Sequence, residues 1–338
     1  MKLKPIKEQV VVVFGASSGI GRETALQFAG RGAKVVVAAR DENGLQSLVG
    51  EIEQNGGSAA YLVSDAVEFE SVKAVADFAV SRFGHLDTWV HAAATSLYAT
   101  FEQTTPEEFR RVIEVNLVGA AHGAMAALPH LRATGGGALS VISSVEGKTA
   151  FPLQSAYASS KHGIIGFLDA LRMELKREGA PISVTNVMPA GINTPFFNKA
   201  RTKLGVKPMP APPIYNPNVV ANVILWAAEH PTREVFAGGA GKSLWFSQWL
   251  SPSIVDKFGA RLGVQAQKTD EPRNPDAPDS LFHPIAGFDR TTGDFSDIAK
   301  TRSFSGWLET HPLQRKILKG AAFSLAALLI TRAFDEES

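Results

Sequence analysis

The feature that most restricts the fold of this chain is a buried strand followed at once by a glycine-rich turn and a helix. Four successive valines lie within Gln9–Phe14, which is typical of a strand covered on both faces in a parallel sheet. Glycines follow at positions 15, 19 and 21, and a helical pattern continues to Gly30. Glycine permits positive φ and close approach of the backbone, and a helix N-terminus favours negative charge. The turn therefore indicates a pyrophosphate site, with an ordinary βα turn as the alternative.

Strands and helices alternate along the chain after this turn. Further strands are expected at 34–39, 59–63, 86–91, 138–142 and 182–188, and helices at 41–55, 71–83, 106–132 and 155–177. This order predicts an α/β fold with a doubly wound parallel sheet, a Rossmann fold, in one domain over residues 8–250. The last strand and its turn are expected at 236–241, before a short helix with three aromatic residues, Trp245, Phe246 and Trp249.

Residues 251–338 are expected to form a C-terminal extension of the domain. Its polar segment 269–280 is expected to be extended, and its terminal helix is expected at about 313–334 around the apolar run 320–330. That run is shorter than the roughly 20 residues that cross a bilayer. The helix is expected to cover an apolar patch, with peripheral contact to a membrane as the alternative. The proline-rich stretch 207–213 cannot be helical, and we expect it in a lid or a subunit contact.

Charge and composition narrow the class of protein. The chain has 338 residues, 34 basic and 33 acidic, and no basic stripe interleaved with aromatic residues, so nucleic-acid binding is not expected. There is no cysteine, which excludes a disulfide framework and a thiolate metal site, and we expect no metal. No secretory signal precedes the first strand, so the expected compartment is the cytoplasm.

A second motif lies in the middle of the chain. Tyr157 and Lys161 are four residues apart in a helical pattern and therefore share one face, and Ser144 follows the strand that ends near Ile142. The ammonium of Lys161 is expected to favour the ionised phenol, which would make Tyr157 an acid or base in hydride-transfer chemistry. An exposed helix pair is the alternative for Tyr157 and Lys161.

Taken together, these motifs resemble those of the short-chain dehydrogenase/reductase family, from about Val10 to about Gly241. The matching residues, in the family's order and spacing, are Gly15, Gly19, Gly21, Asn116, Ser144, Tyr157 and Lys161. The resemblance implies an enzyme acting on CH–OH or C=O groups, in which Tyr157 exchanges the proton and Ser144 hydrogen-bonds the reacting oxygen. It also implies that Lys161 binds the nicotinamide ribose and that Asn116 holds a water leading to solvent. Singly, Ser144 could be a strand-end hydroxyl and Asn116 a buried asparagine bonded to a neighbouring carbonyl.

The same resemblance implies a set of cofactor-binding residues. They are Gly15, Ser17, Ser18, Gly19, Ile20, Gly21, Arg40, Asp65, Ala92, Tyr157, Lys161, Pro189, Ile192 and Thr194. Asp65 is expected near the adenine, and Ile192 and Thr194 near the nicotinamide amide. Arg40 stands where NAD enzymes carry an acid, so NADP is favoured over NAD. The alternative for Arg40 is a solvated loop charge, partly offset by Asp41.

Two departures from the family pattern occur together. Phe14 stands where the family has a threonine, and His91-Ala92-Ala93-Ala94 stands where it has Asn-Asn-Ala-Gly. Replacing both members of a buried polar pair can be nearly neutral. We therefore expect Phe14 to pack near His91 and Ala92.

The substrate pocket is expected to be mostly apolar. Its expected lining is Val145, Glu146, Phe151, Gln154, Phe196 and Phe197, which favours a hydrophobic ketone, aldehyde or alcohol. By resemblance, helices 106–132 and 155–177 pair between subunits in a homodimer or homotetramer. The alternative function is a non-catalytic NADP-binding protein that acts through a partner or a membrane surface. The four catalytic positions favour the enzyme, because a binding module has no chemical need for them.

Overall fold

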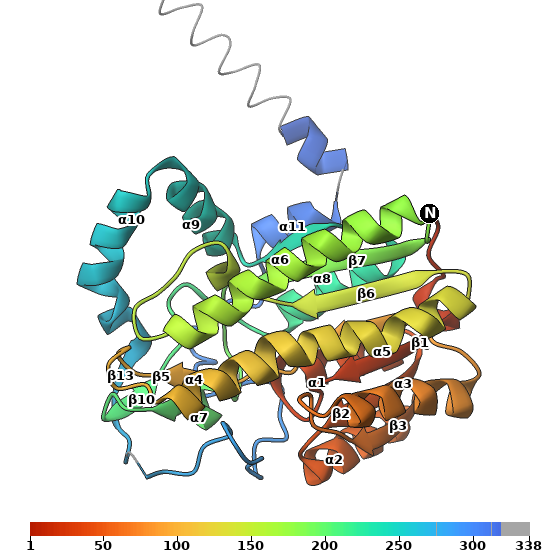
Figure 1. Cartoon of the computed structure of the whole chain (residues 1–338), viewed down its shortest axis with the longest axis horizontal. Helices are drawn as coiled ribbons and strands as arrows, with labels where there is room; N and C mark the ends of the chain where they lie inside the picture. Colours follow the sequence, from red (N-terminus) through yellow and green to blue (C-terminus); the bar gives the residue numbers. More distant parts are fainter. Residues whose placement is uncertain (275, 312, 319–338) are drawn as a thin grey trace, which may run out of the picture.

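A seven-stranded parallel sheet forms the centre of the computed structural model, which describes residues 1–274, 276–311 and 313–318 (Figure 1). The strands are β1 (Val10–Phe14), β2 (Lys34–Ala39), β3 (Ser58–Val63), β4 (Thr88–His91), β6 (Gly137–Ile142), β7 (Ile182–Pro189) and β12 (Glu234–Ala237). Their order is β12-β7-β6-β4-β1-β2-β3, and every pairing is parallel. The chain reverses its direction of progress across the sheet between β1 and β4, which is the place where such folds bind nucleotides. The expected doubly wound α/β fold is confirmed.

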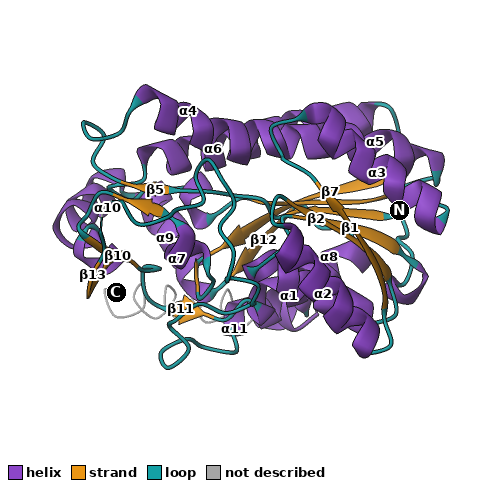
Figure 2. Cartoon of the chain, turned by 90° about the horizontal axis from the view of Figure 1, so that it is seen from below, coloured by secondary structure: helices purple, strands orange, loops and turns teal. Residues whose placement is uncertain are grey.

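Helices cover both faces of the sheet, as the view in Figure 2 shows. On one face lie α1 (Gly19–Gly30), α2 (Glu42–Gln54) and α8 (Asn218–Glu229), and on the other α3 (Phe69–Phe83), α4 (Pro106–Ile113), α5 (Gly119–Ala133) and α6 (Ser155–Arg177). Every residue of β1 is buried, because its side chains alternate between the two apolar layers. The helices begin and end within about two or three residues of the expected ranges.

The helix expected at 106–132 is continuous but contains a π-helical turn. Thr105 and Glu108 form a capping box at its start, and the turn Glu114–Val118 joins α4 to α5. Such turns are frequent at functional sites, and this one carries Asn116. Within the described part of the chain, only the helix Pro106–Ala133 is long and apolar enough to cross a membrane. Half of its most apolar stretch is buried in the protein, as in the core helix of a globular domain.

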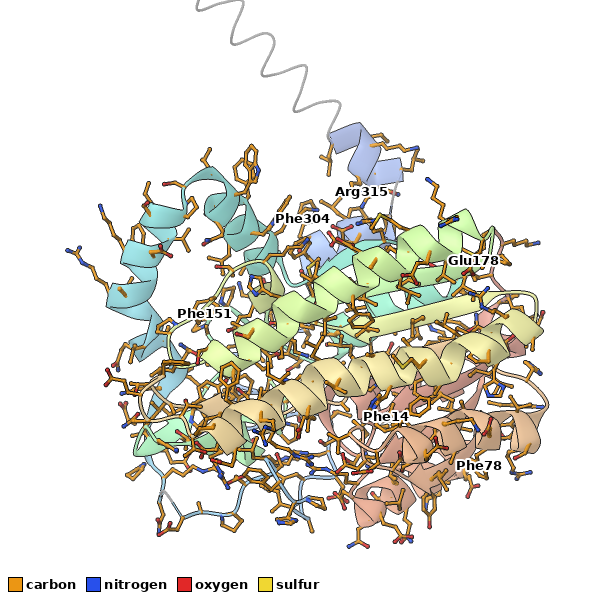
Figure 3. All side chains as sticks on the ribbon, in the orientation of Figure 1. Phe14, Phe78, Phe151, Glu178, Phe304 and Arg315 are labelled. Atoms are coloured by element: carbon orange, nitrogen blue, oxygen red, sulfur yellow. The ribbon has the colours of Figure 1, made fainter. Side chains whose placement is uncertain are left out.

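Phe14 replaces a polar contact with an aromatic one, as expected. Its ring stacks on His91 with 5.2 Å between centroids, and on Trp89 with 5.9 Å. Phe14 and His91 are also register partners in β1 and β4. Figure 3 shows Phe14 in the interior, behind the helices of one face. Burial lowers the pKa of His91 to about 3, so this imidazole is neutral and packs as an aromatic ring.

The end of the sheet differs from the sequence expectation. The last strand is β12, Glu234–Ala237, and the residues expected as its turn already open helix α9 (Gly239–Leu250). Gly238 takes a φ of +110°, which turns the chain directly from strand to helix. The three aromatic residues fall on α9, as expected.

The C-terminal extension runs back along the carboxyl edge of the sheet. After α10 (Pro252–Phe258) it forms β13 (Lys268–Pro272), which pairs antiparallel with β10 (Val206–Pro208) of the proline-rich stretch. The chain then crosses the edge without regular structure and reaches α11 (Phe304–Thr310). Residues 313–318 are helical, and the remainder of the helix expected at 313–334 lies outside the described residues. The smaller elements are β5 (Leu97–Tyr98), β8 (Gly191–Ile192), α7 (Phe196–Lys199), β9 (Arg201–Thr202) and β11 (Ile214–Tyr215), with short turns at Ile6–Glu8, Val145–Gly147, Gly259–Gly263 and Gln265–Gln267.

Candidate active site

The glycine turn between β1 and α1 leaves no room for side chains. Gly15 has a φ of +88°, and a Cβ there would lie 2.4 Å from the amide nitrogen of Ala93. A Cβ on Gly21 would lie 2.2 Å from the carbonyl oxygen of Gly15. Ser18, the N-cap residue of α1, makes no side-chain hydrogen bond to the helix amides. The turn therefore presents backbone N–H groups and a positive helix end to the cleft, which fits a dinucleotide pyrophosphate.

One cavity at the carboxyl edge of the sheet brings the expected cofactor residues together. Its lining includes Gly15, Ser17, Ser18, Gly19, Ile20, Gly21, Arg40, Asp65, Ala92, Tyr157, Lys161, Pro189, Ile192 and Thr194. They come from the ends of β1, β2, β3, β4 and β7 and from the start of α6. In a parallel sheet the carboxyl ends of all strands meet at one edge, which explains how residues so far apart in sequence converge.

Ser144, Tyr157 and Lys161 lie together where this cavity meets a second one. Ser144 follows β6, and its hydroxyl accepts a hydrogen bond from the Glu146 amide at 3.1 Å. Tyr157 and Lys161 lie in the first two turns of α6, with the Lys161 ammonium 5.3 Å from the centre of the phenol ring. The ammonium is buried and donates to the Ile142 carbonyl at 3.0 Å. Ser144 and Tyr157 line both cavities.

Asn116 is buried behind these three residues and does not line either cavity. Its amide nitrogen donates to the Thr95 carbonyl and to the Ser160 hydroxyl, each at 3.0 Å, and its carbonyl oxygen accepts from the Thr95 amide at 2.8 Å. The bonded-asparagine alternative thus describes its side chain. Since Ser160 precedes Lys161, Asn116 fixes the start of α6 against the segment after β4.

Burial dominates the ionisation of this site. Burial raises the pKa of Tyr157, the charge of Glu146 raises it further, and the hydrogen bond with Ser144 opposes the shift. The expected effect of Lys161, a more acidic phenol, is outweighed by desolvation of the phenolate. Burial also lowers the pKa of Lys161 to about 7, against the attraction of Glu146.

The second cavity has the lining expected for the substrate pocket. Its volume is about 600 Å³, and it includes Val145, Glu146, Phe151, Gln154, Phe196 and Phe197. Helices α9 and α10 and the prolines 210 and 212 close it, so the proline-rich stretch forms part of its wall. One polar residue of the lining connects the domain to the extension: the Gln154 amide donates to Glu146 at 3.2 Å and to Gln267 of the extension at 2.7 Å.

Arg40 is neither a free donor nor a solvated loop charge. Its two terminal nitrogens donate to the carbonyls of Ser280 and Phe282, each at 2.8 Å, and the Asp65 carboxylate lies 3.9 Å away. Asp41 serves as the N-cap of α2 and accepts from the Gly44 amide. The guanidinium still lines the cofactor cavity, but the C-terminal extension holds it in place.

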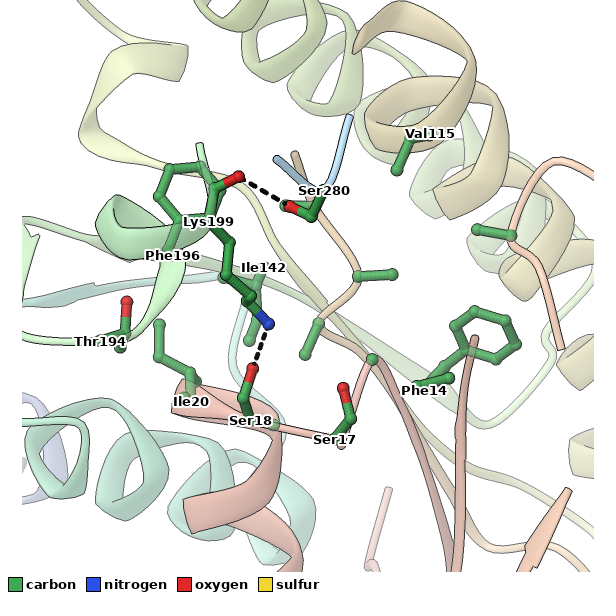
Figure 4. A pocket seen from close by; sticks show the side chains of 18 of the residues that line it. Phe14, Ser17, Ser18, Ile20, Val115, Ile142, Thr194, Phe196, Lys199 and Ser280 are labelled. Carbon is green, nitrogen blue, oxygen red and sulfur yellow. Dashed lines mark hydrogen bonds between the residues drawn. The ribbon is translucent and has the colours of Figure 1, made fainter. Parts of the chain in front are cut away.

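The structure adds residues that the sequence motifs did not indicate. Lys199 lines the cofactor cavity, and its ammonium donates to the Ser18 hydroxyl at 2.7 Å (Figure 4). Burial lowers the pKa of Lys199 to about 8. Ser280, Pro284 and Ile285 of the extension also line this cavity. No sequence motif marks Lys199, which follows Phe196, Phe197 and Asn198, as a cofactor residue, and none marks the residues of the extension. No cluster of histidine, aspartate and glutamate in the described ranges could hold a metal ion.

Comparison with known proteins gives one consistent family. The family model described as short chain dehydrogenase matches residues 9–205. The uncharacterized oxidoreductase YxnA of Bacillus subtilis is 36% identical over 331 residues, covering 97% of this chain and 90% of that protein. Cyclohexanol dehydrogenase of an Acinetobacter strain is 34% identical over 64% of this chain and 86% of its own length. An alcohol dehydrogenase of Thermococcus sibiricus, solved with 5-hydroxy-NADP, matches with a TM-score of 0.60 and 25% identity, covering 68% of this chain and 95% of that one.

Proposed function

The chain belongs to the short-chain dehydrogenase family of oxidoreductases, and from this premise we propose that it transfers a hydride between NADP and a hydrophobic ketone, aldehyde or alcohol. One observation carries the proposal: Ser144 and Tyr157 line both the cavity at the glycine turn and the apolar cavity beside it. A carbonyl group at that junction would face the cofactor on one side and the phenol on the other.

The chain's own residues supply positioning and the proton. A bound nicotinamide would supply the hydride to the carbonyl carbon, or take it up in the reverse reaction. The phenol of Tyr157 would give its proton to the carbonyl oxygen as the new C–H bond forms, and the Ser144 hydroxyl would donate to the same oxygen. Lys161 would hold the nicotinamide ribose and stabilise the phenolate left behind, and Asn116 would hold the start of α6 in register. The roles of Asn116, Ser144, Tyr157 and Lys161 are part of this proposal.

The preference for NADP rests on Arg40 and its surroundings. Arg40 directly follows β2, at the position where NAD enzymes carry an acid, and Lys199 adds a second cation on the same cavity. Two cations favour a 2′-phosphate over a free hydroxyl. The related alcohol dehydrogenase was solved with an NADP derivative, which supports the same choice.

The hydrophobic substrate class rests on the second cavity. Its lining is mostly apolar and includes Phe196, Phe197, Leu244 and Phe258. The polar residues that line it include Glu146, Gln154 and two serines of α9, Ser243 and Ser247. Such a pocket binds a substrate by apolar burial and orients it with few polar contacts. Cyclohexanol and cyclohexanone are suitable first probes, since a related protein is named for cyclohexanol.

We propose a homodimer or homotetramer built on the continuous helix α4–α5 and on α6, in the cytoplasm. Val118 of the π-helical turn, Met125 of α5 and Met173 of α6 are exposed, and α5 and α6 lie side by side in Figure 1. Peripheral membrane contact through the C-terminal helix stays the alternative placement. Much of that helix lies outside the described residues.

The direct test combines binding and turnover. Wild type is titrated with NADPH and NADH in parallel, and cyclic and open-chain ketones are then added while the absorbance of the reduced cofactor is followed. We expect tighter binding of NADPH, and a rate that falls by about 10² to 10⁴ in Tyr157→Phe with binding retained. Tyr61→Phe, at a tyrosine of β3 outside both cavities, is the matched control. Tight binding with no turnover on any carbonyl compound would favour the non-catalytic alternative.

A further inference from the structure

A segment of the C-terminal extension lies across the cofactor cavity. Residues 279–294, here called the strap, have no helix or strand, and Ser280, Pro284 and Ile285 line the same cavity as the glycine turn. Figure 4 shows Ser280 opposite Ser18 and Ser17, with Lys199 between them. In Figure 1, the strap belongs to the blue loop that follows β13.

The first part of the strap is firmly anchored to the domain. Leu281 is fully buried in an apolar cluster with Leu97 and Val112. The carboxylate of Asp279 accepts from the Arg201 guanidinium at 2.7 Å. The Leu281 carbonyl accepts from Arg111 at 3.1 Å. A buried leucine and bonds to two arginines fix this end independently of any cofactor.

The second part of the strap reaches the glycine turn and the segment after β7. The Arg290 carbonyl accepts from the Gly19 amide at 2.9 Å, and the Gly293 amide donates to the Asn193 carbonyl at 3.2 Å. Asp294 closes this end through an ion pair of 2.6 Å with Lys207. The Gly19 amide belongs to the row of N–H groups that a pyrophosphate would approach, so the strap and a phosphate share one surface.

The two parts together span the whole length of the expected dinucleotide site. Ser280 and Phe282 bind Arg40, where the adenosine end is expected, and Gly293 contacts the segment of Asn193 and Thr194, where the nicotinamide end is expected. A nucleotide in the cavity would therefore lie along the strap, and its pyrophosphate would compete with the Arg290 carbonyl for the Gly19 amide.

We propose that residues 279–294 form a second wall of the cofactor site, under which the dinucleotide enters and from which it is released only when the strap detaches. This inference rests on the proposed function, since it needs a nucleotide in the cavity. Both ends of the strap must loosen before it detaches: Asp279 and Leu281 hold the first part, and the backbone bond of Arg290 to the glycine turn holds the second. Nucleotide exchange is then limited by opening of the strap, and loosening its anchors accelerates both association and release.

The first arm of the test measures the rate of nucleotide release. NADPH is bound to wild type, Asp279→Ala and Asp297→Ala, and its release is followed by fluorescence after displacement with excess NADP. Asp279→Ala removes the bond to Arg201, whereas Asp297 is exposed, lies outside the strap and makes no side-chain hydrogen bond within the described residues. We expect release to become at least about tenfold faster in Asp279→Ala and to stay unchanged in Asp297→Ala.

The second arm is independent of the folding of Asp279→Ala. Because the chain has no cysteine, Ile285→Cys gives a single thiol on the strap, facing the cavity. We expect saturating NADPH to slow its reaction with a maleimide by at least about tenfold, and to leave Ser81→Cys, exposed on α3, unaffected. The proposed role of the strap is refuted, and the proposed function stands, if two results are found together. NADPH binds without slowing the labelling of Ile285→Cys, and it leaves Asp279→Ala at the same rate as wild type. If wild type binds neither NADPH nor NADH, both are refuted.

Discussion

The sheet domain and the strap reach the same cleft in two different ways. In the domain, most site residues lie where a strand ends or a helix begins, so their positions follow from the local pattern of the chain. In the strap, no repeating backbone bonds exist, and residues are held by individual contacts to distant parts of the domain. Ser280 bonds Arg40 and Lys199, and Arg290 bonds Gly19. Local pattern therefore predicts the first set of residues and is silent on the second.

The largest expected difference is in stability, between the sheet domain and the C-terminal extension that contains the strap. Phe14→Ala removes a buried ring stacked on His91 and Trp89, and we expect it to lower the free energy of unfolding by about 3–5 kcal/mol. Phe304→Ala, at an exposed ring of α11 (Figure 3), is expected to change it by less than about 0.5 kcal/mol. Urea unfolding followed by tryptophan fluorescence measures both. Equal losses in the two variants would show that the extension is as tightly packed as the core.

The next largest effect is the pH dependence of stability that comes from the buried carboxyl group of Glu146. Its hydrogen-bond partner Gln154 also binds Gln267 of the extension. Burial raises the pKa of Glu146 to about 8. Between its usual value near 4.5 and about 8, the folded chain keeps a proton that the unfolded chain has lost, so this group's contribution to stability is full below 4.5 and declines as pH rises to 8. We expect wild type to lose stability over this window by on the order of a few kcal/mol more than Glu146→Gln. Glu102→Gln, at an exposed glutamate, is the control. Parallel pH profiles of unfolding for wild type and Glu146→Gln would contradict a buried, protonated Glu146.

The smallest expected effect is on the choice of cofactor. Arg40→Ala removes a guanidinium that the domain presents and the strap holds. We expect the dissociation constant for NADPH to rise about tenfold to hundredfold, and that for NADH to change less, because hydrogen bonds to a charged phosphate are the stronger ones. Arg31→Ala, exposed at the end of α1, should change neither constant. An unchanged ratio of the two dissociation constants would mean that Arg40 holds the strap in place and does not recognise the 2′-phosphate.

Much of the domain could be predicted from the sequence, for physical reasons. Several local patterns each fix a local geometry: the four valines of β1, the glycines 15, 19 and 21, and the spacing of Tyr157 and Lys161. The parallel sheet then brings the ends of its strands, and the residues that follow them, to one edge. The stacking of Phe14 on His91 could be predicted as well, because the two residues stand at matching ends of neighbouring strands.

The remaining features could not be predicted because they depend on contacts between distant segments. The hydrogen bonds of Arg40 to Ser280 and Phe282 join residues more than 200 positions apart, and no sequence motif around Ser280 or Phe282 indicates this contact. The raised pKa of Tyr157 depends on how deeply α6 is buried and on a carboxyl group, Glu146, that its spacing does not reveal. The start of α9 directly after Gly238 reflects the tight turn at that glycine.

Transfer of isotope from the cofactor tests hydride transfer at the junction of the two cavities most directly. NADPH carrying deuterium at the reactive carbon of the nicotinamide is mixed with wild type and cyclohexanone, and the alcohol is analysed by mass spectrometry and NMR. We expect one deuterium on the carbinol carbon with wild type, and none in the same interval with Tyr157→Phe, which still binds NADPH. Tight NADPH binding by wild type without deuterium in the product of any ketone of the apolar panel would contradict the proposed reaction.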